Sequence, residues 1–444
     1  MKLNFKIKDN SINYTCTVVK IEHLFPIEGA DKIQRCNILG NDIVVSKELQ
    51  VGTIMLYFVS GTRLNPDYCK FNNLYSDSAL NIDDKQKGYI NNKCKVSAVK
   101  LRNVISNGML MPLESLDAFH LDIKNSLKVG DSFTDINEYS ICEKYIVVVK
   151  ENTHSPNKLK NVKRFNRLID DYFQFHNCTE QLPKNIHKLN PDDIIGIHYK
   201  KHGVSAVFAN IPTLRPLKWW EKLLKRWGVK IEDKVYDIIY SSRKVIKNKY
   251  IYSNKSDLPQ SKDIWGVVDK EIGHLIPKNW NVFGEIVGFT PKGSSLQPRY
   301  DYGCKQGEHK FYVYKISIVN PDGKLIYLTD KQIQEWCDSV GLLFSDTLLY
   351  YGRAINRYNF KPTKNDPWTV EKWRERFLEV LKHTFTEKDC KMCVNKVPME
   401  GIVLRIEKLN KYEAYKLKSQ AFFLLESKAQ DNEVTNLEDN QDES

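Results

Sequence analysis

The sequence lacks any long apolar run. None of its stretches approaches the roughly 18 apolar residues that suggest a membrane-spanning helix, so no membrane contact is expected. The first residues, MKLNFKIKDNSINY, lack the apolar core of a signal peptide. This favours a cytoplasmic protein, or one of the host cytoplasm if the source is viral. We find no internal repeat. With 41% hydrophobic and 27% charged residues over 444 positions, the composition excludes a disordered chain and suits two or three globular domains.

Acidic residues are scarce relative to basic ones. Asp and Glu number 55 against 67 Lys and Arg, which gives a formal charge of +12. Residues 431–444 hold six acids and no Lys or Arg, so the rest of the chain carries +18. Such an excess of positive charge attracts polyanions, of which nucleic acid is the commonest. Lysines on solvated surfaces that bind no partner would give the same net charge. The ten cysteines should be reduced thiols or metal ligands in a cytosolic chain.

Short apolar segments dominate residues 14–115. They have the length and spacing of β-strands and are separated by turn-rich sequence without a long amphipathic helix, which predicts a small barrel. A polar, Lys-rich stretch, ENTHSPNKLKNVKR, is typical of a linker or a surface loop. From Asp192 to about Ser427, β-rich runs alternate with two helices.

Those two helices have clear boundaries. KWWEKLLKRWG should end at Gly228, and PWTVEKWRERFLEVLKHTF should begin at Pro367. The first combines aromatic and basic residues. We expect its Trp219, Leu223 and Trp227 to pack in the core rather than to stack on nucleic acid.

The segment IIGIHYKKHGVSAVF (residues 194–208) interrupts two apolar strands with Lys200-Lys201-His202-Gly203. A lysine becomes a nucleophile when burial or neighbouring positive charge lowers its pKa, and a glycine permits a tight turn. The tetrapeptide resembles the Lys-x-Asp/His-Gly motif of the covalent ligase and capping-enzyme superfamily. The resemblance implies that Lys200 attacks the α-phosphate of ATP and accepts AMP, and that His202 and Gly203 belong to the nucleotide site.

Five downstream segments resemble later motifs of that superfamily, in the same order. They are IIYSSRKVIKN with Arg243, VFGEIVGF with Glu285, FYVYKIS with Tyr314, VPMEGIVLR with Glu400, and YEAYKLKS with Lys416 and Lys418. The resemblance implies ribose contacts from Arg243 and Glu285, and stacking of Tyr314 on adenine. It also implies that Glu400 faces Mg²⁺ or Mn²⁺. Lys416 and Lys418 lie on one strand face at period two, where they would bind the triphosphate and serve catalysis.

Two N-terminal segments resemble the OB-fold module appended to some tRNA synthetases. They are IEHLFPIEGADKIQRCNILG (21–40) and KLRNVISNGMLMPL (100–113), the second with Asn103 in place of a glycine. An OB domain before the catalytic one, together with histidine at position 202, resembles the Deinococcus-type RNA ligase family. Tyr199 and Ser205 depart from that pattern, where relatives often have Glu and Asn.

The resemblance implies an α+β protein, with an N-terminal OB-fold β-barrel followed by a nucleotidyltransferase domain of antiparallel sheets with flanking helices. The domains are expected at residues 1–125 (OB fold), 126–190 (connecting segment), 191–428 (adenylyltransferase) and 429–444 (acidic disordered tail).

The function implied is that of an ATP-dependent RNA ligase. It would join 3′-OH and 5′-phosphate ends at nicks, through a lysyl-AMP and an AMP-capped 5′ end. Its partner would be RNA or RNA-containing duplex ends, and the protein would be a monomer. The alternatives are a DNA ligase, a guanylyltransferase, or a non-catalytic RNA-binding protein with an OB module. A non-catalytic protein whose ligase domain is no longer used should have lost Lys200, Glu285, Glu400 or Lys418. All four are present.

Cys390-Lys-Met-Cys393 is half of a zinc knuckle. Cys304 or Cys337 would have to supply further ligands. Buried apolar thiols are the competing interpretation.

Overall fold

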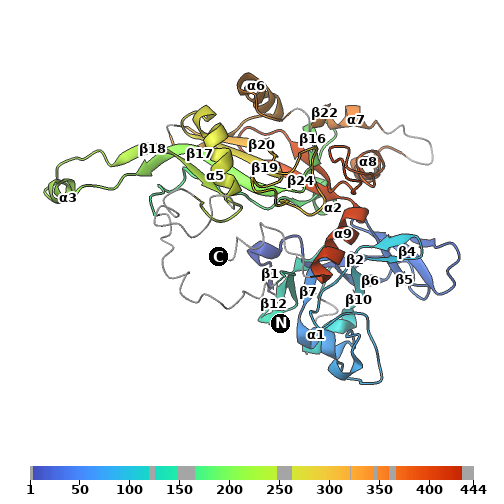
Figure 1. The fold of residues 1–444 in the computed structure, drawn as a ribbon. Helices are drawn as coiled ribbons and strands as arrows, with labels where there is room; N and C mark the ends of the chain where they lie inside the picture. Colours follow the sequence, from blue (N-terminus) through green and yellow to red (C-terminus); the bar gives the residue numbers. More distant parts are fainter. Residues whose placement is uncertain are drawn as a thin grey trace.

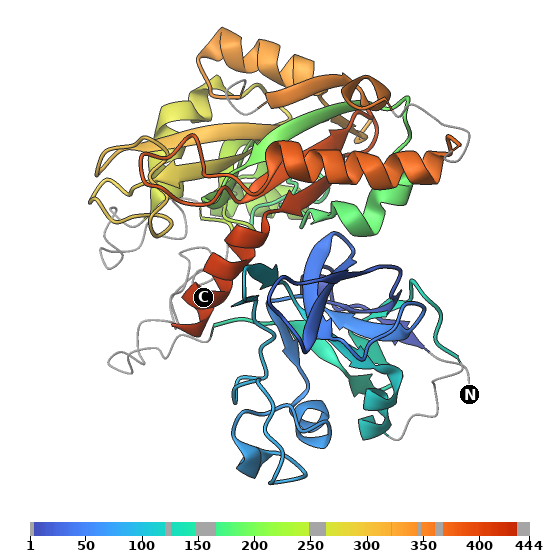
Figure 2. The ribbon, with the colours of Figure 1, turned by 90° about the vertical axis from the view of Figure 1, so that its right-hand side faces the viewer.

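The computed structural model describes residues 4–119, 126–147, 166–247, 263–320, 322–344, 348–359 and 367–432. It contains two β-rich domains, with the C-terminal helix α9 (Gln420–Asp431) beside both of them (Figures 1 and 2). The Lys-rich stretch at 151–164 and the acidic residues after position 432 lie outside the described residues. The predicted tail begins at residue 429, whereas α9 continues through Asp431, so the first residues of that segment are helical.

The N-terminal domain is a set of short antiparallel strands around two clusters of buried apolar side chains. A central sheet has the order β10-β6-β2-β11, and a second layer is formed by β3, β4 and β5. Strands β2 and β6 supply the buried side chains of Val18, Leu56 and Phe58. The elements are β1 (Phe5–Lys6), β2 (Cys16–Lys20), β3 (Leu24–Pro26), β4 (Ile33–Ile38), β5 (Asn41–Ser46), β6 (Ile54–Phe58), β7 (Thr62–Leu64), α1 (Pro66–Phe71), β8 (Val99–Leu101), β9 (Val104–Ser106) and β10 (Met109–Pro112).

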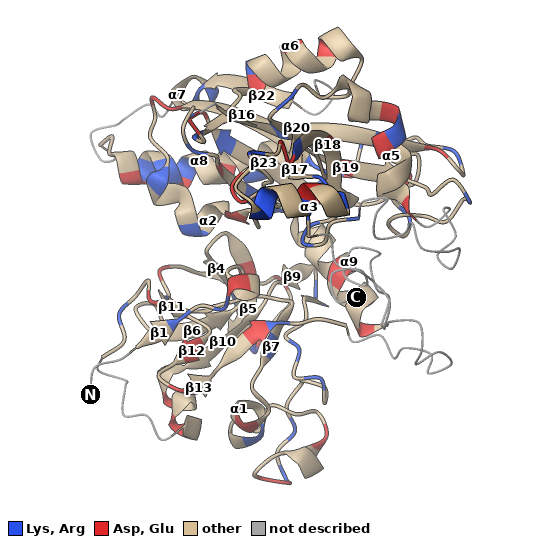
Figure 3. Ribbon diagram, turned by 90° about the vertical axis from the view of Figure 1, so that its left-hand side faces the viewer, with Lys and Arg blue, Asp and Glu red and all other residues tan. Residues whose placement is uncertain are grey.

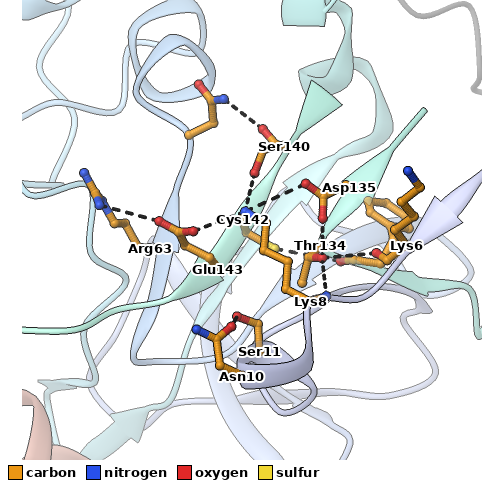
Figure 4. Close-up of polar contacts among 12 residues, drawn as sticks. Lys6, Lys8, Asn10, Ser11, Arg63, Thr134, Asp135, Ser140, Cys142 and Glu143 are labelled. Carbon is orange, nitrogen blue, oxygen red and sulfur yellow. Dashed lines mark hydrogen bonds and ion pairs between the residues drawn. The ribbon is translucent and has the colours of Figure 1, made fainter. Parts of the chain in front are cut away.

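Four further strands join this domain from the segment expected to be a connection. They are β11 (Ser132–Phe133), β12 (Asp135–Ile136), β13 (Tyr139–Ser140) and β14 (Cys142–Lys144), which pair with β2, β1, β12 and β7 respectively. Lys8 stabilises the arrangement, because its ammonium group donates to Ser140 Oγ at 2.8 Å and to Glu143 Oε2 at 3.1 Å (Figure 4). The N-terminal sheets therefore extend beyond residue 125.

The catalytic domain is built on two five-stranded sheets. One has the order β15-β24-β23-β16-β22 and the other β18-β17-β19-β20-β21, and all pairs are antiparallel except β15 with β24. The mixed fold with an N-terminal OB-type domain and an antiparallel catalytic domain is as predicted. The strands are β15 (Glu180–Gln181), β16 (Ile194–Lys200), β17 (Val204–Leu214), β18 (Lys234–Ser241), β19 (Trp280–Gly288), β20 (His309–Val319), β21 (Leu325–Tyr327), β22 (Leu348–Arg353), β23 (Gly401–Ile406) and β24 (Glu413–Lys418).

The same domain also contains helices. They are α2 (Leu182–Asn185), α3 (Trp219–Arg226), α5 (Ile264–Ile272), α6 (Asp330–Val340), α7 (Ala354–Arg357) and α8 (Val370–Phe385). The predicted helix is present as α8, although it begins at Val370 and not at Pro367, and it buries Trp373 and Phe377 against the first sheet. Helix α5 buries Trp265 against the second sheet.

Helix α3 corrects one expectation. It ends before Gly228, as predicted, but it lies at the tip of the long β17–β18 hairpin, away from both sheets (Figure 1). Trp219 is 77% exposed, Leu223 44% and Trp227 74%. The prediction that these side chains pack in the core is wrong, because the hairpin extends past the elements that would cover them.

The two domains meet along α9 and the edge of the first catalytic sheet. The buried Lys95 ammonium group donates to the carbonyl oxygen of Ser427 at 2.9 Å and lies 2.6 Å from the Asp431 carboxylate. Lys382 of α8 donates to the carbonyl oxygen of Gly40. The contacts of Lys95 hold α9, and that of Lys382 holds α8, against the N-terminal domain. In the described parts of the chain, no helix is both long and apolar enough to cross a membrane.

Candidate active site

Three adjacent strands of the first sheet bring the predicted catalytic residues together. Strand β23 lies between β16 and β24, and in register Lys200 is opposite Gly401, which is opposite Lys418. Gly401 has a φ of 144°, and a Cβ there would lie 2.0 Å from the carbonyl oxygen of Leu417. A glycine is therefore required at this position of β23. The preceding residue, Glu400, lies beside both lysines.

Glu400 is the centre of a buried charge cluster. Its Oε1 lies 2.9 Å from Lys200 Nζ and 3.6 Å from Lys418 Nζ, and its Oε2 lies 3.9 Å from His202 Nδ1. Burial alone would raise the pKa of this carboxyl group, but Lys200, Lys418 and His202 lower it to about 2. The carboxylate is therefore ionised at neutral pH. Its Oε2 is buried and accepts no hydrogen bond among the described residues, which suits it to a further cationic partner.

Lys416 and Lys418 project from the same face of β24, because buried and partly exposed positions alternate along this strand. Lys418 Nζ contacts Glu426 of α9 at 3.1 Å. Burial would lower the pKa of Lys418, but Glu426 and Glu400 raise it above its ordinary value. Lys416 has no such compensation, and burial together with Lys418 and Lys200 lowers its pKa to about 7. Of the two lysines, only Lys418 is therefore held in its cationic form at neutral pH.

The motif loop crosses from one sheet to the other, since β16 ends at Lys200 and β17 begins at Val204. The Gly203 N–H donates to Glu285 Oε1 at 3.1 Å. A Cβ at Gly203 would lie 2.3 Å from the carbonyl oxygen of Ile286. Close packing of the loop against β19 is thus the reason for glycine here, and this packing brings Glu285 to the motif.

His202 is enclosed by aromatic rings. The ring centroids of Tyr300 and Phe422 each lie 5.0 Å from its imidazole, edge to face. Its backbone N–H donates to the hydroxyl of Tyr302 at 2.5 Å. Burial lowers the pKa of His202 to about 4 despite the nearby Glu400 and Glu426, so the imidazole is neutral at pH 7.

His176 is a residue that the sequence analysis did not select. Its Nδ1 is 2.8 Å from the hydroxyl of Tyr314, the predicted adenine contact. Burial lowers the pKa of His176 well below its ordinary range, and the charges of Arg243, Lys315, Lys200 and Lys416 lower it further. The charges of Arg243, Lys200 and Lys416 thus act on the same imidazole that contacts Tyr314. His176 precedes β15 in a segment without regular structure, where no pattern distinguishes it.

The Cys390–Cys393 pair packs at the edge of an apolar cluster that includes Tyr300, Tyr302 and Phe422. All ten cysteines are free thiols. Within the described ranges, no group of three or more His, Cys, Asp or Glu side chains is arranged to hold a metal ion. The described residues thus bring no complete zinc site together around Cys390 and Cys393.

A lysine at a strand end, paired with a buried carboxylate and faced by a second lysine, on two antiparallel sheets that follow an OB-type domain, defines the polynucleotide ligase class. Two family models match the chain, an OB-fold domain over residues 15–113 and RNA ligase over residues 230–418. Residues 230–418 thus match an RNA ligase domain, and residues 15–113 match an OB-fold domain that precedes it. This confirms the predicted resemblance, while the Deinococcus-type subfamily stays a prediction.

Solved structures share this architecture. An RNA ligase variant of Naegleria gruberi with AMP and Mn is 17% identical, with a TM-score of 0.54 over 92% of this chain and 97% of that one. A second variant of that ligase, with ATP and Mn, is 15% identical, with a TM-score of 0.54 over 96% and 99%. The Naegleria gruberi ligase with PPi is 18% identical, with a TM-score of 0.52 over 96% and 100%. No curated protein sequence matches the chain.

Proposed function

We propose that this protein is an ATP-dependent RNA ligase that seals 3′-OH and 5′-phosphate ends at nicks through a lysyl-AMP intermediate. The observation that carries the proposal is the row Lys200, Glu400 and Lys418, in which one buried carboxylate contacts both amines. The RNA ligase family match over residues 230–418 supports the choice of polynucleotide. The relatives solved with ATP, AMP and PPi support the choice of nucleotide.

In the first step, Lys200 Nζ loses a proton and attacks the α-phosphorus of ATP, so that a P–N bond forms and pyrophosphate leaves. Lys418 is held cationic by Glu426 and Glu400 and would stabilise the negative charge on the phosphates. Lys416 would add a second charge when protonated. Glu285, Arg243 and Tyr314 would contact the nucleoside from the second sheet and the adjoining loop.

In the next two steps, the RNA 5′-phosphate attacks the lysyl-AMP and frees Lys200, and the 3′-OH then displaces AMP from the activated end. Mg²⁺ or Mn²⁺ would supply charge neutralisation to the phosphates. Glu400 would hold this ion, because its Oε2 is buried and accepts no hydrogen bond among the described residues. A carboxylate oxygen is the donor that such hard cations prefer.

Incubation of the full-length protein with α-labelled ATP, in parallel with α-labelled GTP, tests the proposal. We expect label on the protein from ATP alone, and its transfer to the 5′-phosphate of a nicked RNA duplex. Label from GTP alone would identify a guanylyltransferase. Absence of label from both would leave a non-catalytic RNA-binding protein, and sealing of DNA nicks but not RNA nicks would identify a DNA ligase.

A further inference from the structure

The most exposed aromatic surface of the catalytic domain lies at the tip of the β17–β18 hairpin. We call residues 214–236, which include α3 and the adjoining strand ends, the arm. In the arm, Trp219, Trp220, Leu223 and Trp227 are 77%, 43%, 44% and 74% exposed. Residues four apart share one face of a helix, so Trp219, Leu223 and Trp227 form a single exposed row.

The arm is held together by its own polar contacts. The guanidinium of Arg215 makes two hydrogen bonds to the buried carboxylate of Glu221, at 2.7 and 3.0 Å. Glu221 also accepts from the backbone N–H of Lys218 at 2.7 Å, at the start of α3. Lys225 Nζ lies 2.6 Å from Asp233. The exposure of the tryptophans therefore belongs to a built element, and two of the arm's three acids are engaged within it.

The remaining charge of the arm is positive. It has seven Lys or Arg against three acids. No ion pair within the described residues involves four of these bases, Lys222, Arg226, Lys230 and Lys234. Lys222 and Arg226 lie on the helix next to the Trp219 row, at i+3 and i+7 from Trp219. Figure 3, which looks toward the arm, shows Lys and Arg along α3.

We propose that the arm is a binding site for the RNA strand that flanks the ends being joined. The exposed indoles would stack on bases, and the adjacent cations would contact the phosphates. This inference rests on the proposed function for the identity of the polynucleotide. The same positive charge repels a second copy of the arm, whereas it complements a polyanion.

The arm is remote from the reacting ends. Strand β17 runs from the motif loop to the arm over 11 residues, which corresponds to about 35 Å at the rise of an extended strand. The arm would therefore contact nucleic acid far from Lys200. It should strengthen the binding of substrates with long flanks and contribute nothing to the binding of short ones.

The test compares dissociation constants of full-length variants for nicked RNA duplexes with long and short flanks. One variant combines Trp219→Ala with Trp227→Ala, and another combines Lys222→Gln with Arg226→Gln. Matched controls are Trp368→Ala, an exposed tryptophan outside the arm, and Lys324→Gln combined with Lys331→Gln, which removes two exposed charges elsewhere.

For the long-flanked duplex, the tryptophan variant should raise the Kd at least about tenfold with an unchanged salt dependence. The charge variant should also reduce the slope of log Kd against log salt by about 1 to 2. Short-flanked duplexes and both controls should show wild-type affinity.

Wild-type affinity of both arm variants for long flanks would overturn the proposal. So would a loss of self-association on tryptophan replacement, seen by size-exclusion chromatography, because the arm would then contact another copy of the chain. Labelling by ATP reports on the proposed function separately, since the binding comparison needs no catalysis.

Discussion

The amine of Lys200 lies 2.9 Å from Oε1 of Glu400, and the same oxygen lies 3.6 Å from the amine of Lys418. One carboxylate oxygen thus lies within ion-pair distance of both the proposed nucleophile and a proposed phosphate-binding cation. A metal ion bound at Glu400 would compete with Lys200 for this carboxylate.

Replacement of Lys200 by methionine should abolish labelling by α-labelled ATP, because the apolar side chain supplies no attacking nitrogen. The matched control is Lys201→Met. Lys201 is buried with its amine 4.6 Å from the ring centroid of Tyr312, away from the Glu400 pair, so labelling should persist. Gel autoradiography decides the point, and labelling lost only in Lys201→Met would move the nucleophile to that residue.

Glu400→Gln should change the dependence of stability on acid. The folded pKa of Glu400, about 2, is below the ordinary value of 4.5, so its pairing stabilises the fold above pH 4.5 and is lost as pH falls toward 2. At about 1.4 kcal/mol per pKa unit, the contribution is on the order of 3 kcal/mol. Urea unfolding of both proteins between pH 2.5 and 6 should show a shallower acid loss in the variant. Parallel curves would contradict the pairing.

Lys416 should make anion binding sensitive to pH. Its pKa is lowered to about 7, so its positive charge disappears as pH rises through 7, and affinity for pyrophosphate should fall. Lys416→Arg keeps the charge over this range and serves as the control. Titration calorimetry from pH 6 to 8.5 should show that the dissociation constant of the wild type for pyrophosphate, divided by that of Lys416→Arg, increases with pH. A constant ratio would show that Lys416 does not titrate there.

Gly203→Ala should disturb the approach of the motif loop to β19. The added methyl group would lie 2.3 Å from the carbonyl oxygen of Ile286, and relief of such overlap costs about 1–3 kcal/mol. Because the loop carries the Gly203–Glu285 hydrogen bond, labelling by ATP should fall more than thermal stability. Gly323→Ala is the matched control, because its φ of 76° strains an alanine while nothing lies within 4 Å of the added methyl group, so its stability should fall and its labelling should persist. A Gly203→Ala protein that labels like this control would contradict the packing argument.

The sequence was sufficient to predict the elements at Lys200, Glu400 and Lys418, because Lys200 and Lys418 lie in strands of clear apolar pattern and Glu400 directly precedes one. It did not reveal that β23 lies between β16 and β24, since pairing across some 200 residues leaves no local pattern. His176 was missed for a related reason, because only the tertiary fold brings it to Tyr314. The two-residue strands β11 to β13 are too short to show an alternating pattern.

The error at α3 has a different cause. An apolar row at helical spacing predicts that this face of the helix packs against another element, but the sequence does not show whether another element lies close enough to do so. Trp219 and Trp227 are uncovered because β17 and β18 continue beyond the sheet's other strands (Figure 1).

Helix α9 begins two residues after the end of β24, the strand that carries Lys418. Ser419, which follows Lys418, accepts from the Phe422 N–H at the start of the helix, and its far end is bonded to Lys95 of the OB-fold domain (Figure 2). A helix of about 18 Å thus connects the strand of Lys418, a proposed phosphate-binding residue, to the OB-fold domain. If the OB-fold domain rotates, α9 would transmit the rotation to the strand that holds Lys418. The orientation of the two domains and the alignment of the phosphates at Lys418 would then change together.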